Sequence, residues 1–105
     1  MSKRGRKVGS LIRDQLVELI YYLGKGYGYE LYKLYTKVWG AVTLRSIYYH
    51  LNKGSELEIF KINEIEEVNG NYSWGLKAKR IIYSLGPNAH PKGDIKIKQK
   101  LSKNP

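Results

Sequence analysis

Apolar residues recur at helical spacing through the first half of the chain. On the segment 11–23 one apolar stripe is formed by Ile12, Leu16, Leu19, Ile20 and Leu23. On the segment 28–39 a second stripe is formed by Leu31, Leu34, Tyr35 and Val38. Steps of three and four residues place such side chains on one face of an α-helix. The pattern therefore predicts two helices, with Ser10 as a cap of the first and Gly40 at the end of the second.

The segment 42–51 predicts a third helix with a well-marked start. Thr43 can cap its first turn, and Val42 can pack on Ile47 as a hydrophobic staple. The stripe expected to face the core consists of Leu44, Ile47, Tyr48 and Leu51. The opposite side and its flanks carry no acid and consist of Arg45, Ser46, Tyr49, His50, Asn52 and Lys53. Such cationic, hydroxyl and amide groups can meet phosphates and base edges, so this face is a candidate for binding nucleic acid. An ordinary solvated helix face is the alternative.

After the third helix the pattern changes from helical to extended. The segments 56–68 and 72–85 mix β-branched and aromatic residues with charged residues, and the second alternates clearly. Between them lies Asn-Gly-Asn at 69–71, a turn signal because Asn and Gly tolerate positive φ. The sequence therefore predicts a long two-stranded hairpin that ends before Gly86.

Length and charge bound the organisation of the molecule. The chain has 105 residues, enough for one domain with one modest core. Its 19 Lys and Arg residues against nine Asp and Glu residues give a net charge of +10, which favours a polyanionic partner. We expect a basic arm at 1–9, a folded domain at 10–86 and a basic tail at 87–105, in which Ile95 and Ile97 have weak strand character.

Several classes of function lack the residues that they need. Without cysteine, disulfides and thiolate metal sites are unavailable, and the two histidines, His50 and His90, lie far apart in the sequence. No phosphate loop, nucleophile motif or paired-carboxylate setting is evident, so we expect no enzyme, no metal and no cofactor. Without a signal-peptide pattern or an apolar run of about 18 residues, we expect no membrane partner and a cytoplasmic protein.

The order of the expected elements and several short motifs resemble the winged helix-turn-helix family. SIYYHL at 46–51 resembles the middle of the recognition helix in PadR-like and ArsR-like transcriptional regulators. GYGYELYKL at 26–34 is similar to the start of their second helix, and RIIYSLGP at 80–87 to the closing strand of their wing. The resemblance covers about 11–86. It implies an α+β fold, with three helices followed by a long two-stranded β-hairpin wing, and a DNA-binding function.

The C-terminal tail departs from the PadR-like pattern. Those regulators carry a long C-terminal dimerisation helix, whereas the residues after Pro87 show no helical stripe. The oligomeric state therefore stays open, a homodimer included. No cluster of cysteines or histidines indicates an effector site.

Two further groups of basic residues are candidate contacts. The N-terminal group surrounds Gly5 and consists of Lys3, Arg4, Arg6 and Lys7. An Arg-Gly-Arg core can enter a narrow A·T minor groove, although a solubilising tail is the alternative. The group on the second strand consists of Lys77, Lys79 and Arg80, which are candidate phosphate ligands.

These observations favour a small nucleic-acid-binding protein, with duplex DNA first and structured RNA second. The leading interpretation is a DNA-binding transcription regulator or architectural protein that places its third helix in the major groove. The alternative is an RNA-binding, ribosome-associated protein, because basic arms around a small fold are also typical of proteins held in ribosomal RNA. A winged helix that serves as a protein-interaction module fits the charge less well.

Overall fold

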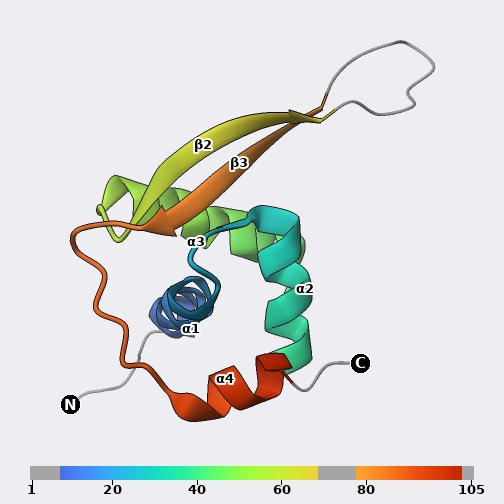
Figure 1. Cartoon of the computed structure of the whole chain (residues 1–105), viewed down its shortest axis with the longest axis vertical. Helices are drawn as coiled ribbons and strands as arrows, with labels where there is room; N and C mark the ends of the chain where they lie inside the picture. Colours follow the sequence, from blue (N-terminus) through green and yellow to red (C-terminus); the bar gives the residue numbers. More distant parts are fainter. Residues whose placement is uncertain (1–7, 69–77, 103–105) are drawn as a thin grey trace.

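The computed structural model describes residues 8–68 and 78–102, and the side chains of 11–66 and 80–102. In chain order the elements are α1 (Val8–Leu23), β1 (Gly26–Tyr27), α2 (Gly28–Trp39), α3 (Leu44–Glu56), β2 (Phe60–Val68), β3 (Ala78–Leu85) and α4 (Ile95–Ser102). The described chain is therefore an α+β domain of four helices and a three-stranded antiparallel sheet (Figure 1). The predicted fold class, α+β, is confirmed.

The sheet has the strand order β1-β3-β2. Strands β2 and β3 pair from Phe60 opposite Leu85 to Val68 opposite Ala78, with an irregularity between Ile62 and Glu64. In Figure 1 they form a long ribbon that runs outward past α2 and α3. The two predicted strands are therefore present and pair antiparallel, but the first begins at Phe60 rather than at 56. The expected turn at 69–71 lies outside the described residues.

Strand β1 was not expected from the sequence. It consists of two residues between α1 and α2, and Gly26 lies opposite Tyr83 while Tyr27 lies opposite Ile82. Two residues carry no periodicity that a sequence pattern could reveal. This strand exists because β3 offers a free edge next to the start of α2.

The core lies where α1, α2, α3 and β2 meet. Its fully buried side chains are Leu16, Leu19, Ile20, Leu31, Ile47, Leu51 and Phe60. Each of the three predicted stripes contributes to this set, and Tyr35 and Val38 of α2 are also buried, so the periods of the three helices are confirmed, whereas Leu23 at the end of the first stripe is exposed. Tyr48 departs from its stripe, because its ring leans over the start of α2 and leaves 40% of the residue exposed.

Two helix boundaries differ from the sequence prediction. Helix α1 begins at Val8, so Ser10 lies within it rather than capping it, and the last residues of the predicted arm are helical. Helix α3 begins as predicted, because the Thr43 hydroxyl accepts a hydrogen bond of 3.0 Å from the Ser46 amide. It then continues through Gly54 to Glu56, since a glycine there lets the Phe60 ring pack against the helix.

The C-terminal segment is folded against the domain, which corrects the expectation of a basic tail with weak strand character. Ile95 and Ile97 lie in α4, and Ile97 is buried in the core beside α1 and α2. Ile97 and Leu101 are four residues apart and both face the core, which is helical rather than alternating spacing. The alternation of Ile and Lys in 95–98 concealed that spacing.

Candidate nucleic-acid interface

Helix α3 turns its predicted binding face to solvent. Because Ile47 and Leu51 are fully buried, residues on the other side of the helix point outward, and Arg45, Tyr49 and Asn52 are all exposed. Tyr49 has 58% of its surface accessible. Ser46 and Lys53 are partly exposed on the same side. The structure therefore brings five of the six predicted residues of α3 onto one accessible surface, which we call the α3 face.

The sixth residue, His50, does not belong to this face, which corrects the expectation that it lies on the exposed side of the helix. It is only 5% exposed, and the Arg13 guanidinium of α1 donates a 3.1 Å hydrogen bond to its Nδ1 atom. Burial, and then the neighbouring charge of Arg13, lower the pKa of His50 below its usual value of 6.5. Its spacing of three residues after Ile47 is the sequence signal that placed it on the buried side.

One acid lies close to the α3 face. Glu56, in the last turn of α3, has its Oε1 atom 3.8 Å from Lys53 Nζ. Both side chains are well exposed, so this pair adds little stability and leaves the lysine free to change partner. The α3 face is therefore acid-free over its first three turns and mixed in charge at its end.

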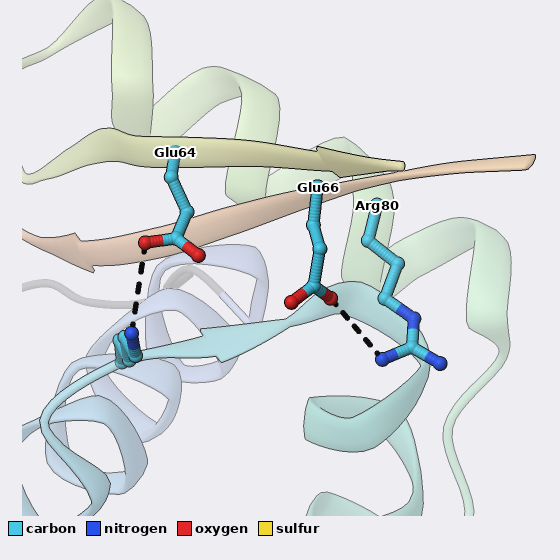
Figure 2. Close-up of polar contacts among 4 residues, drawn as sticks. Glu64, Glu66 and Arg80 are labelled. Carbon is cyan, nitrogen blue, oxygen red and sulfur yellow. Dashed lines mark hydrogen bonds and ion pairs between the residues drawn. The ribbon is translucent and has the colours of Figure 1, made fainter. Parts of the chain in front are cut away.

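Arg80 lies on β3, where the Glu66 carboxylate partly balances its positive charge. Its Nη1 atom lies 3.4 Å from Glu66 Oε1, and its guanidinium lies 4.4 Å from the centre of the Tyr27 ring. Figure 2 shows Glu64 and Glu66 side by side on β2. Glu64 Oε1 lies 3.6 Å from Lys25 Nζ. Both of these carboxylates are therefore paired with cations, and the charge of Arg80 is partly offset by Glu66.

The other predicted basic contacts cannot be placed. Lys79 belongs to β3, but its side chain lies outside the described residues, as do the whole of Lys77 and the N-terminal group at 3–7. Their contact with nucleic acid stays a prediction.

A tyrosine-rich groove lies beside the α3 face and was not expected from the sequence. It has a volume of about 380 Å³ and is lined by Tyr27, Tyr29, Tyr48, Tyr83, Asn52 and Arg80. The feature of the sequence that could have indicated such a groove is its tyrosine content, ten in 105 residues. Because these side chains come from β1, α2, α3 and β3, only the tertiary fold brings them together.

A second cavity, of about 500 Å³, lies between α1 and the segment that leads into α4. Trp39, Ile97 and His90 are among its lining residues. Over 8–68 and 78–102, no three His, Asp or Glu side chains are grouped so as to hold a metal ion. Helices long and apolar enough to cross a membrane are also lacking in those ranges.

Comparisons of the chain with protein-family models, curated proteins and solved structures found no match. The resemblance to PadR-like and ArsR-like regulators therefore stays a prediction based on the motifs themselves.

Proposed function

We propose that this protein is a winged helix-turn-helix protein that binds duplex DNA through the α3 face, as a transcription regulator or an architectural protein. Three helices followed by a long two-stranded hairpin is the element order of that fold. The link between α2 and α3 spans only residues 40–43, as short as the turn of a helix-turn-helix. These features support the assignment of α3 as the recognition helix.

The observation that carries the proposal is the exposed surface of α3, which is acid-free over its first three turns, on a chain of net charge +10. An α-helix fits the major groove of B-form DNA, which is about 12 Å wide. There Arg45 can reach guanine or phosphate, and Asn52 can donate and accept on an adenine edge. Tyr49, which is 58% exposed, adds a hydroxyl at the tip of its side chain. The first turn of α3 would meet the bases first.

The second candidate, binding to structured RNA, is favoured by a second basic surface. Lys92, Lys96 and Lys98 are exposed on α4 and the segment before it, and in Figure 1 α4 lies on the opposite side of the domain from α3. The major groove of A-form RNA is too deep and narrow for a helix, so an RNA partner would depend on phosphate contacts from such lysines.

Two charge reversals of equal size distinguish these candidates. One variant carries Arg45→Glu and Lys53→Glu on α3, and the other carries Lys96→Glu and Lys98→Glu on α4. If α3 binds DNA, the α3 variant should lose at least about tenfold in affinity for duplex DNA, since base and phosphate contacts are lost together. The α4 variant, with the same net charge, should lose about threefold at most at physiological salt, where screening limits distant charges.

Fluorescence anisotropy with labelled DNA and RNA duplexes measures both losses. Equal losses for the two variants on DNA would contradict a specific role of α3. A larger loss for the α4 variant, seen on RNA, would favour the second candidate. Lys100 is left unchanged because its Nζ atom donates to the Val38 carbonyl and thereby joins α4 to α2.

A further inference from the structure

The tyrosine-rich groove has the dimensions and lining of a small-ligand site. Its volume of about 380 Å³ lies within the usual range of binding pockets, about 300–1,000 Å³. It lies between the start of α2, the middle of α3 and β3, and it shares Asn52 with the α3 face. A ligand in the groove would therefore lie directly beside a nucleic acid bound to α3.

Two of its aromatic rings are open to solvent yet supported from behind. Tyr29 is 47% exposed and stacks on Tyr32, with 5.9 Å between ring centres. Tyr48 is 40% exposed and lies against the backbone of Gly28, where an added Cβ would come within 2.2 Å of its ring. Rings held in this way lose little freedom when a flat ligand stacks on them.

The polar groups of the groove suit a neutral ligand that can both donate and accept hydrogen bonds. Asn52 offers an amide with both functions, and burial raises the pKa of the Tyr83 hydroxyl, which keeps that group protonated. Arg80 is partly balanced by Glu66, and four tyrosines make most of the lining aromatic. This lining favours a neutral aromatic ring over a phosphate as the occupant.

We propose that the groove binds one unstacked nucleobase of the nucleic acid held by α3. Every base presents a π-face that can stack on tyrosine, and its edge carries donors and acceptors that match an amide and a phenol. The net charge of +10 draws a polyanion, rather than a free neutral base, to this surface. The inference rests on the proposed function, and it implies a preference for single-stranded or bulged sites over perfect duplexes.

The test uses the full chain and four labelled oligonucleotides of one sequence. They are a perfect DNA duplex, the same duplex with one bulged 2-aminopurine, the single DNA strand and the single RNA strand. We expect about tenfold tighter binding to the bulged than to the perfect duplex, with a change in 2-aminopurine fluorescence as the base stacks. The two single strands show whether the unpaired base is taken from DNA, from RNA or from both.

Tyr29→Ala and Tyr48→Ala should each remove most of the preference for the bulge, while affinity for the perfect duplex stays within about twofold. Tyr21→Ala is the matched control, because Tyr21 on α1 is equally exposed, at 48%, and lies outside the groove. Two independent groove variants are used in case one of them fails to fold. Thermal unfolding of each variant shows whether it is folded.

Equal affinity for bulged and perfect duplexes, or an unchanged 2-aminopurine signal, would overturn the base-binding groove while leaving the proposed function intact. The same preference in both groove variants as in the wild type would overturn it as well. Failure to bind any of the four oligonucleotides would overturn the proposed function, and the groove proposal with it.

Discussion

At the scale of single residues, His50 shows how one buried group makes stability depend on pH. It receives a hydrogen bond from Arg13 at Nδ1 and is almost fully enclosed, so the neutral imidazole is the form that the fold accepts. Protonation would place a second positive charge next to the guanidinium in a site with little water. His50 therefore joins α3 to α1 only while it is neutral.

His50 should make the domain less stable in mild acid. Because its pKa is lower in the folded than in the unfolded chain, the unfolded chain binds more protons between the two values, and stability rises with pH there. We expect the free energy of unfolding to fall as the pH drops through about 6.5. Urea unfolding at several pH values measures this, and His50→Gln should remove that part of the slope. His90→Gln, at an exposed histidine, should leave the pH dependence of the free energy of unfolding unchanged. An unaltered pH dependence in His50→Gln would contradict the role given to His50.

Gly54 should be a position where alanine destabilises a helix. Alanine normally stabilises a helix interior by about 0.5–1 kcal/mol relative to glycine. Here an added Cβ would lie 2.3 Å from Cδ2 of the buried Phe60 ring, so the ring must shift. We expect Gly54→Ala to lower the free energy of unfolding by about 1–3 kcal/mol. Asn52→Ala, on the exposed side of the same helix, is the control and should cost nothing; a stabilised Gly54→Ala would show that the packing is loose.

At the scale of elements, one carboxylate on α1 holds the turn that leads into α4. The Glu18 side chain, buried on α1, accepts hydrogen bonds from the backbone amides of Lys92, Gly93 and Asp94, at 2.6, 2.9 and 3.3 Å. Gly93 has a φ of +73°, a conformation that glycine adopts without strain. The turn before α4 is therefore wrapped around the end of one side chain.

Replacing Glu18 by glutamine should loosen α4 without unfolding α1. The amide keeps one acceptor oxygen but presents an NH₂ group to backbone donors, so at least one charge-assisted hydrogen bond is lost, at about 1.5–3 kcal/mol. Hydrogen exchange should become faster at 92–102, while the core amides of α1 and α3 change less. Asp14→Asn, an exposed carboxylate one turn earlier on α1, is the matched control. Uniform acceleration over the whole domain would mean that α4 does not open separately.

At the scale of the whole molecule, the part of the chain that the structure describes carries exposed cations on the α3 face and α4, with further lysines on α2, and a pair of carboxylates on β2. The α3 face and α4 carry exposed cations, whereas Glu64 and Glu66 on β2 pair with Lys25 and Arg80 across the sheet. The ion pairs on the sheet are exposed and weak. The net charge of +10 thus acts mainly through the cations that lie away from these pairs.

Binding to duplex DNA should therefore depend strongly on salt. If about five to eight phosphates are neutralised, the slope of log K against log salt should be about −4 to −7. Titrations by anisotropy between low and physiological salt measure it. A slope near zero would remove the electrostatic basis of the proposed function. The paired charge reversals on α3 and α4 then show which surface contributes to the slope.

The local pattern of the sequence determined three helices, the Thr43 cap and two long strands. Each of these features depends on residues that lie close together in the sequence. It also determined that Arg45, Tyr49 and Asn52 face outward, since Ile47 and Leu51 fix the rotation of the helix. The sequence also determines the net charge, which does not depend on the fold.

Only the tertiary structure decided the remaining features. Strand β1 depends on the edge of β3, the turn before α4 depends on Glu18 more than 70 residues away, and the hydrogen bond that His50 accepts comes from Arg13 on another helix. The tyrosine-rich groove combines side chains from β1, α2, α3 and β3. Periodicity reports which side of a helix or strand is buried; which partner covers that side is set by contacts between residues far apart in the chain.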